Sequence, residues 1–331
     1  MKKRVVLLVL FSIIIISGCN GSDKIDNIPE EVIDDEVIDS NMPVPGENID
    51  EMIIEEVKEE FKWEYGGAAI PGKYADADIV DLGNGKYRMY YSAEPEIAGF
   101  KGQVYSALSS DGINWDNENG ERIDEATFPS VIKLPDNRYR MYFQNQGLIK
   151  SAISDDGLSW KRESGNRIDT SNNAGLTLDS VLAPTVIKNG DEYIIVYAGA
   201  INEEYPEKVP NNDIHLFLWA TSKDGLNFEK KGIALDSRND RFKGWLDGAE
   251  FTRWDDGSLH LYFWGYKGIY HIEFDNSKFS QNAVLDFTTA TDPNMMFPQD
   301  PPGDPTLAKI NNKWFMYYGQ HEKGIYYATL E

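Results

Sequence analysis

A unit of roughly 50–65 residues repeats five times after residue 61, and this repeat constrains the fold more than any other feature. Each copy begins with an apolar run, passes through a short Asn, Asp or Gly turn, and ends in a run rich in Val, Ile, Tyr and Phe. Two such runs around a tight turn predict a β-hairpin. The five hairpins span Asp76–Ser92, Phe128–Gln144, Ala183–Gly199, Asp247–Gly265 and Asp304–Gly319.

A second pattern follows the first three hairpins and predicts two more strands for each unit. It combines an apolar run, a Ser-x-Asp-Gly turn and an aromatic residue, and it spans Val104–Trp115, Ile149–Trp160 and Leu216–Phe228. The last two units keep the third strand without the turn, in Lys267–Phe274 and Lys323–Leu330. Four strands in each of five units predict an all-β, five-bladed β-propeller with four-stranded antiparallel blades over residues 61–331. The last unit has three recognisable strands, so we expect residues 61–65 to supply its outer strand and latch the ring.

The first 18 residues have the pattern of an export signal. Three basic residues precede an apolar run that ends at Ile16, which is shorter than a membrane-spanning helix needs. The run closes on Ile16-Ser17-Gly18-Cys19, which resembles the bacterial lipobox, and Cys19 is the single cysteine of the chain. We therefore predict lipidation of Cys19 and an extracytoplasmic, membrane-anchored location in the cell envelope. The alternative is an ordinary signal peptide with a chance cysteine.

Residues 19–60 are predicted to be an acidic tether. Residues 20–60 hold fifteen acids and two lysines, and self-repulsion keeps such a stretch extended, although part of 49–60 could instead form a short helix. The whole chain carries a formal charge of −23. Nucleic-acid binding depends on basic side chains, so this charge argues against nucleic acid and favours neutral ligands. We expect the chain to act as a monomer.

Carboxylates and aromatic residues gather at one predicted face of the propeller. The first strand of each blade lines the axis, and its start shares a face with the end of the second strand. The candidate binding residues at this face are Asp78, Asp179, Asp247, Trp245, Tyr266, Asp304 and His321, beside the candidate catalytic residues Asp76 and Glu250. Glycosidic bonds are cleaved by two carboxylates of different pKa. For any one Asp, capping of a turn is the alternative role.

The repeated strands and Ser-x-Asp-Gly-x-x-aromatic turns from about residue 63 onward resemble the five-bladed glycosidases of families 43 and 32, the arabinanase, xylosidase and invertase group. The resemblance implies a carboxylate base or nucleophile at Asp76, where Ala77 replaces the usual Pro. The family's second carboxylate falls on Ser130 and its acid on Leu182, so a replacement acid would come from Glu250, Asp179 or Glu94, with Glu250 ranked first because it is the fourth-blade counterpart of Asp78.

The predicted function is therefore a membrane-anchored glycoside hydrolase-like protein that acts on a neutral oligo- or polysaccharide through Asp76 and Glu250. The first alternative is a propeller that binds glycans without cleaving them, because two family carboxylates are replaced. The second is a structural or protein-docking propeller, which would show a large exposed apolar patch. No cofactor is expected, although the resemblance also implies a structural cation at the axis marked by His321.

Overall fold

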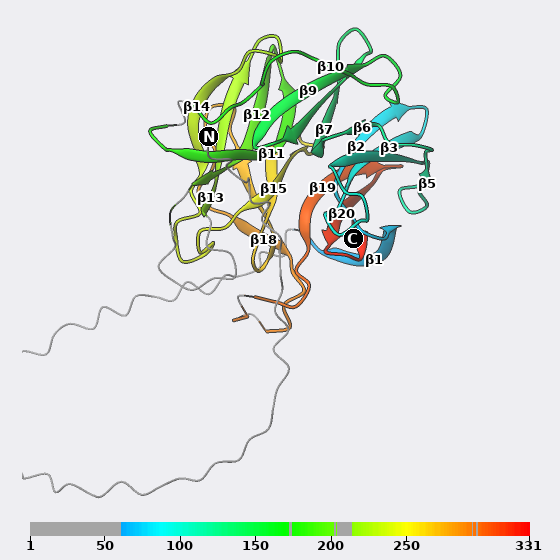
Figure 1. The fold of residues 1–331 in the computed structure, drawn as a ribbon. Coiled ribbons are helices and arrows are strands. Elements are labelled where there is room, and N and C mark those ends of the chain that lie inside the picture. The colour runs from blue at the N-terminus through cyan, green and yellow to red at the C-terminus, as the bar shows by residue number, and fades with distance from the viewer. Residues whose placement is uncertain (1–60, 172–173, 202, 204–213, 293, 296) are drawn as a thin grey trace, which may run out of the picture. The chain divides into compact units, whose positions relative to one another are not determined.

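The computed structural model describes residues 61–331 except 172–173, 202, 204–213, 293 and 296. The signal segment, Cys19 and the acidic tether lie outside the described residues, so their assignments stay predictions. Every regular element in the described part is a strand (Figure 1). None of its segments forms a helix long and apolar enough to cross a bilayer.

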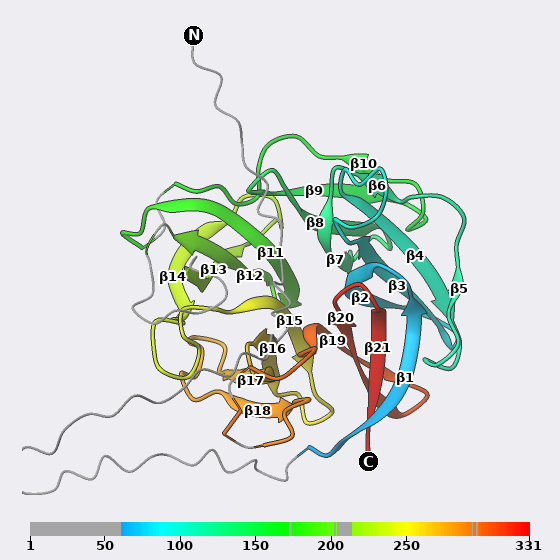
Figure 2. The same cartoon turned by 60° about the horizontal axis from the view of Figure 1, so that its bottom comes forward.

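Twenty-one strands form five antiparallel sheets that surround a common axis (Figure 2). Blade 1 contains β2 (Tyr74–Gly83), β3 (Lys86–Ala93), β4 (Gln103–Ser109) and β5 (Asp116–Asn117), with β6 (Ile123–Asp124) paired to β4. Blade 2 contains β7 (Thr127–Lys133), β8 (Tyr139–Asn145), β9 (Leu148–Ser154) and β10 (Lys161–Arg162). Blade 3 contains β11 (Leu178–Asn189), β12 (Glu192–Ile201), β13 (Ile214–Ser222) and β14 (Glu229–Leu235).

Blade 4 contains β15 (Asp247–Arg253), β16 (Leu259–Gly265), β17 (Gly268–Phe274) and β18 (Val284–Phe287). Blade 5 contains β19 (Gly303–Ile310), β20 (Lys313–Gln320), β21 (Gly324–Leu330) and the N-terminal strand β1 (Trp63–Pro71). The first strand of each blade lies closest to the axis in Figure 2. The five-bladed, all-β prediction is confirmed.

The ring closes through β1, which pairs with β21 and so completes blade 5 with a strand from the other end of the described chain. The pairing is antiparallel and runs from Trp63 opposite Leu330 to Pro71 opposite Gly324. Each face of a propeller blade needs a neighbour to cover it, and this pairing gives blade 5 the same four-stranded width as the other blades. The predicted latch is therefore confirmed, and it extends six residues beyond the predicted stretch.

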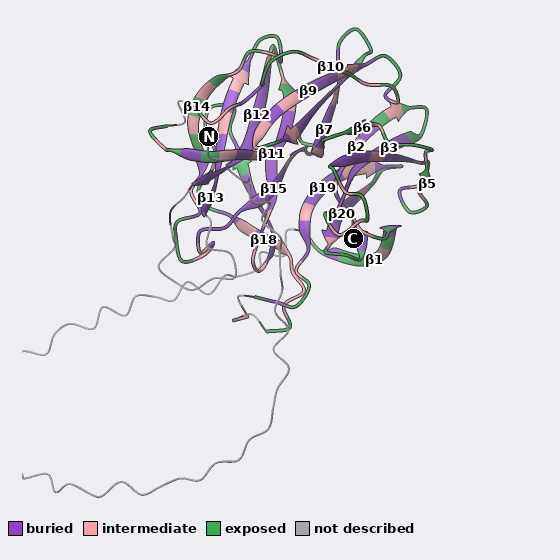
Figure 3. Cartoon of the chain, viewed as in Figure 1, coloured by how far each residue is buried: buried purple, intermediate pink, exposed green. Residues whose placement is uncertain are grey.

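Aromatic and aliphatic side chains fill the spaces between blades, while exposed residues lie mainly at strand tips and in loops (Figure 3). The second strands carry the largest fully buried side chains, which include Tyr90, Tyr142, Tyr262 and Tyr317. These residues have the same register in their blades, opposite Asp78, Ser130, Glu250 and Thr306. Burial of such rings provides most of the free energy that holds the blades together.

The three Ser-x-Asp-Gly turns attach blades 1, 2 and 3 each to one neighbouring blade. The Asp111 carboxylate accepts the backbone N–H of Ile113 and of Asn114, both at 2.8 Å, which fixes the turn. The Tyr317 hydroxyl of blade 5 then donates to the Gly112 carbonyl at 2.7 Å. The same contact recurs twice, from Tyr90 to Gly157 and from Tyr142 to Gly225, each at 2.8 Å. These turns are structural, as their sequence predicted.

Candidate functional site

A β-bulge interrupts the first strand of every blade at the same level near the axis. The bulges lie between Ala75 and Asp78, Thr127 and Ser130, Leu182 and Thr185, Asp247 and Glu250, and Gly303 and Thr306. The first bulged residue has a left-handed φ in all five blades: Asp76 (55°), Phe128 (51°), Ala183 (43°), Gly248 (55°) and Asp304 (46°). Such bulges re-aim side chains and are common beside active sites. Here they turn one residue of each blade toward the axis.

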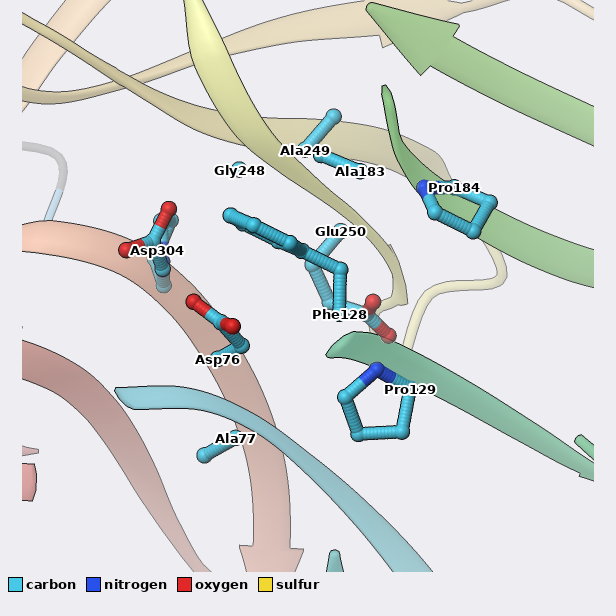
Figure 4. Close-up of a pocket in the computed structure, with 11 residues that line it drawn as sticks. Asp76, Ala77, Phe128, Pro129, Ala183, Pro184, Gly248, Ala249, Glu250 and Asp304 are labelled. Carbon is cyan, nitrogen blue, oxygen red and sulfur yellow. The ribbon is translucent and has the colours of Figure 1, made fainter. Parts of the chain in front are cut away.

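The five bulges surround a small axial cavity of about 20 Å³, which is room for about one water molecule. It is lined by the ten bulge residues Asp76, Ala77, Phe128, Pro129, Ala183, Pro184, Gly248, Ala249, Asp304 and Pro305, together with Glu250 (Figure 4). None of these lining residues is basic. The cavity therefore concentrates uncompensated acid groups among apolar neighbours.

The carboxylates of Asp76 and Asp304 lie on one side of the Phe128 ring in the view of Figure 4. The Trp264 indole donates a hydrogen bond of 3.0 Å to Asp304 Oδ1. Asp76 is hydrogen-bonded to Ser92 of its own blade, and Ser92 Oγ also accepts the Phe128 N–H at 3.0 Å. One side chain thus fixes both Asp76 and the neighbouring blade.

Burial, together with repulsion from the nearby carboxylates of Asp247 and Glu94, raises the pKa of Asp76 to about 7, while the hydrogen bond from Ser92 opposes the change. Burial also raises the pKa of Asp304 well above its usual range, with added repulsion from Asp76 and Asp247. Both carboxyl groups therefore bind a proton more tightly than an ordinary aspartate does. Carboxyl groups with raised pKa values are candidates for general acid–base catalysis.

Asp247 lies next to this pair and is held by its own blade and by blade 3. Its Oδ1 accepts the Gly248 N–H at 2.9 Å, and its Oδ2 lies 3.6 Å from His215 Nδ1. The His215 ring in turn stacks on Trp245, with centroids 4.2 Å apart. Asp247 is therefore a fixed, buried charge that increases the proton affinity of both axial acids.

Glu94, Glu96 and His321 form a second group at the ends of β3 and β20. His321 Nδ1 lies 3.3 Å from Glu94 Oε1, and its Nε2 lies 3.8 Å from Glu96 Oε1. The hydrogen bond to Glu94 raises the pKa of His321, which favours an imidazolium between the two carboxylates. One ligand atom from each residue lies within 4.8 Å of the others, so these three side chains could also hold a cation. The cation suggested for the axis stays a prediction.

Glu250 lines the cavity and is repelled by the nearby carboxylate of Asp78, which is not part of the lining. Thr185 Oγ1 donates to Glu250 Oε2 at 3.0 Å, and Asp78 Oδ2 accepts the Val131 N–H at 2.6 Å. Burial raises the pKa of Asp78 to about 7, and burial with repulsion from Asp78 raises that of Glu250 well above its usual range. The Glu250 carboxylate lies on the other side of the Phe128 ring from Asp76 in Figure 4. Its predicted pairing with Asp76 stays a prediction.

In the first three blades, the residue two positions after the bulged residue also ties its blade to the next one. Asp78 accepts from Val131 of blade 2, Ser130 Oγ accepts the Val186 N–H of blade 3 at 3.0 Å, and Thr185 Oγ1 accepts the Phe251 N–H of blade 4 at 3.2 Å. The family resemblance implies a carboxylate at Ser130, but the hydroxyl of this residue instead links blade 2 to blade 3. Leu182, the other replaced position, packs against the apolar core.

Three other predicted residues lie outside the axial cavity. Asp179 is exposed near the start of β11 and does not line it. Trp245 is 3% exposed, and its ring stacks with that of the half-buried Tyr266 at 6.2 Å and 28°. Trp245 also contacts Trp264, whose indole is bonded to Asp304, with ring centroids 5.9 Å apart.

Phe128, Gly248 and Trp264 were not among the candidate site residues predicted from the sequence, and they have defined positions in this site. A side chain at Gly248 would collide with the Asp304 carboxylate, and its φ of 55° also favours glycine. Phe128 has a conformation that is costly for a bulky residue, and such strain clusters at functional sites. The signal that could have identified Phe128 and Gly248 is their register with Asp76.

No protein-family model and no curated protein sequence matches this chain. Solved structures do match. One belongs to work on the family 130 mannoside phosphorylases and their hydrolases of β-1,2 mannosidic linkages in Candida mannan, with a TM-score of 0.60 and 14% identity over 81% of this chain and 93% of that one. That structure and this chain share the propeller fold.

Two further structures show the same likeness. A glycosyl hydrolase from Bacteroides ovatus has a TM-score of 0.58 and 14% identity over 81% of this chain and 93% of its own. A family 43 β-xylosidase/α-arabinofuranosidase from a compost metagenome, in complex with xylotriose, has a TM-score of 0.57 and 16% identity over 82% of this chain and 96% of its own. The predicted resemblance to propeller glycosidases is confirmed at the level of the fold, and it includes family 43.

Proposed function

We propose that this protein is a glycoside hydrolase that acts on a neutral oligo- or polysaccharide, with Asp76 and Asp304 as its carboxylate pair. The observation that carries the proposal is that two carboxyl groups with raised pKa values face one axial cavity without a basic residue among its lining. The glycoside hydrolase propeller fold supports the reaction class. The net charge of −23 supports a neutral substrate.

In this proposal, Asp304 is the general acid and Asp76 is the general base. Protonated Asp304 gives its proton to the glycosidic oxygen as the bond to the anomeric carbon breaks. Ionised Asp76 takes a proton from the water whose oxygen forms the new bond to that carbon. The products are the two sugars, and the two carboxyl groups exchange protonation states and reset through solvent. Trp264 holds Asp304, and Ser92 holds Asp76, in place for these transfers.

A panel of aryl β-mannosides, α-L-arabinofuranosides and β-xylosides tests this proposal on the purified protein. Asp76→Asn and Asp304→Asn should each lower kcat by at least about 10³-fold, and Asp111→Asn, in an exposed turn, serves as the folded control. If Glu250→Gln abolishes turnover and Asp304→Asn does not, the acid is Glu250, as the sequence analysis ranked it. If the unsubstituted protein releases no product from any substrate, the hydrolase proposal fails.

A non-catalytic glycan-binding propeller is the second candidate. The observation that favours it is the size of the axial cavity, which at about 20 Å³ holds a water molecule but not a sugar ring. The replacement of two family carboxylates, at Ser130 and Leu182, also favours binding without cleavage. Glycan binding that survives Asp76→Asn, without any product, would establish this second function.

We also propose that the propeller is tethered to the outer side of a membrane through lipid on Cys19, with residues 19–60 as the spacer. The support is the sequence pattern around the single cysteine. Metabolic labelling with a radioactive fatty acid tests it, because Cys19→Ser should abolish both the label and membrane fractionation. Label that persists in Cys19→Ser would contradict the anchor. Monomeric state and lack of nucleic-acid binding stay predictions from the sequence.

A further inference from the structure

A row of aromatic side chains leads outward from the axial acids along the blade 4 side. It begins at Trp264, whose indole holds Asp304. Trp264 meets Trp245 edge to face at 5.9 Å, Trp245 stacks with Tyr266 at 6.2 Å, and Tyr266 meets Phe297 at 5.0 Å and 72°. Ring contacts therefore connect Trp264, which is hydrogen-bonded to the proposed catalytic Asp304, to the protein surface.

Trp264 is partly exposed, and exposure then increases from Trp245 outward along this row. Trp245 is 3% exposed, Tyr266 is half-buried, and Phe297 is 47% exposed. Among the described residues only four large hydrophobic side chains are exposed, and Phe297 is the only one of them in ring contact with this row. A single exposed ring needs no explanation, but a ring that extends a fixed aromatic row from a pocket is typical of a binding surface.

Trp245 supports the row and is not itself open to a ligand. His215 stacks on Trp245 at 4.2 Å and 28°, and His215 Nδ1 lies 3.6 Å from Asp247 Oδ2. Tyr266 thus stacks on a ring that is fixed by a buried histidine and a buried carboxylate. A preorganised platform loses little conformational entropy when it binds.

We propose that Tyr266 and Phe297 form an outer subsite, which stacks on the sugar residue next to the one held at Asp76 and Asp304. The C–H-rich face of a neutral sugar packs against aromatic rings, whereas Asp247 and Glu94, the acids next to Asp76 and Asp304, would repel an acidic sugar. This inference rests on the proposed function and makes it more specific. The substrate is a neutral glycan of at least two residues, with its second sugar on blade 4.

Binding of xylotriose, arabinotriose and β-1,2-linked mannotriose to the full chain tests the outer subsite. The measurements use the Asp76→Asn background, so that no turnover interferes, and compare each trisaccharide with its monosaccharide by calorimetry. Tyr266→Ala and Phe297→Ala should each weaken the best trisaccharide about tenfold or more, while Phe297→Tyr keeps it within about threefold. Tyr65→Ala, which removes a 62% exposed ring from the outer strand of blade 5, is the matched control and should have no effect.

Three results would overturn the outer subsite. They are unchanged trisaccharide affinity in Phe297→Ala, an equal loss in the Tyr65→Ala control, and no binding of any trisaccharide to the unsubstituted chain. Binding that depends on Tyr266 and Phe297, without product from the unsubstituted protein, would instead reject hydrolysis and keep the subsite. With turnover, kcat/KM in Phe297→Ala should fall about tenfold more for the trisaccharide than for the aryl monoglycoside.

Discussion

The aspartates of the Ser-x-Asp-Gly turns and those of the axis are the same residue type in opposite environments. Asp111 is near the surface and accepts two backbone N–H groups, and these bonds lower its pKa to about 2. Asp156 repeats this arrangement, also with a pKa of about 2. Asp76 and Asp304 are half-buried at the axis, and loss of solvent raises their pKa values.

The difference teaches that hydrogen bonding separates a structural aspartate from a functional one. A carboxylate that accepts backbone N–H groups is stabilised as the anion and holds a turn. The axial carboxyl groups have fewer donors than acceptor sites and repel one another, which costs stability unless a substrate or proton compensates. Stability is thus gained at the turns and lost at the axis.

The largest expected effect is on activity. Asp304→Asn removes the proton donor and should lower kcat at least about 10³-fold, while the unfolding midpoint stays equal or rises. Asp156→Asn should keep kcat within about threefold and lower the midpoint, because an amide binds its turn more weakly. Kinetics and thermal unfolding on both variants check the comparison. A similar activity loss in both variants would break it.

A large effect on stability is expected where the turns dock. Arg88 forms a bidentate ion pair with Glu118 at 2.8 and 3.0 Å and donates to the Asp156 carbonyl at 3.0 Å. Arg88→Met leaves Glu118 mostly buried without its partner and should cost about 3–5 kcal/mol in denaturant unfolding. Arg138→Met breaks an ion pair whose side chains are 46% and 52% exposed, and should cost less than about 1 kcal/mol. Equal costs would contradict the docking role.

The pH dependence of stability should be set by titration of the axial groups and not by the turn aspartates. The pKa of Asp78 is about 7 in the folded protein, from an ordinary value of 3.8, so the folded state keeps a proton that the unfolded state releases above about pH 4. Stability is therefore greatest below about pH 4 for this group and is lost as pH rises through 7. The raised pKa of His321 acts in the same direction.

The lowered pKa values of the turn aspartates make stability rise with pH, which is the opposite effect. These groups titrate below about pH 4, so they do not change stability between pH 5 and 8. Denaturant unfolding should show a loss of about 2–4 kcal/mol between pH 5 and 8. Asp78→Asn should reduce this slope, and Asp156→Asn should leave it unchanged. A stability that is flat or rises over this range would contradict the raised axial pKa values.

The smallest expected effect compares two tyrosines of equal register. Tyr90→Phe loses the bond to the Gly157 carbonyl and should cost about 1–2 kcal/mol. The buried hydroxyl of Tyr262 has no hydrogen-bond partner among the described residues, because blade 5 lacks the turn, and the nearby Trp254 indole does not reach bonding geometry. Tyr262→Phe should be neutral or slightly stabilising. Unfolding midpoints measure both, and a larger cost at Tyr262 would reverse the interpretation.

Much of the fold was predictable because its signals are local. The hairpin turns and strand runs repeat within short windows, so the blades, the turn aspartates and the latch through β1 could be placed. Asp76 and Asp304 line the axial cavity and Asp247 lies beside them, whereas Asp179 lies near the start of β11 and does not line the cavity. The roles of these residues in binding or catalysis stay predictions.

The geometry of the site was less predictable because it depends on bulges and distant contacts. A bulge shifts side-chain direction by one residue, and no composition signal marks Phe128 or Gly248. The contact of Glu94 with His321 joins residues from different blades. The division of the axial acids into Asp76 with Asp304 and Asp78 with Glu250 depends on the ring of Phe128, which sequence alone does not orient.

The missing side chain at Gly248 has a consequence for anyone who would rebuild this molecule from an averaged repeat. Consensus design assumes that a residue suited to one copy suits all copies. Here the Asp of blade 5 occupies the space that a side chain of blade 4 would need. Five identical blades would place five carboxyl groups in one crowded centre, so a perfectly symmetric ring could not contain this site.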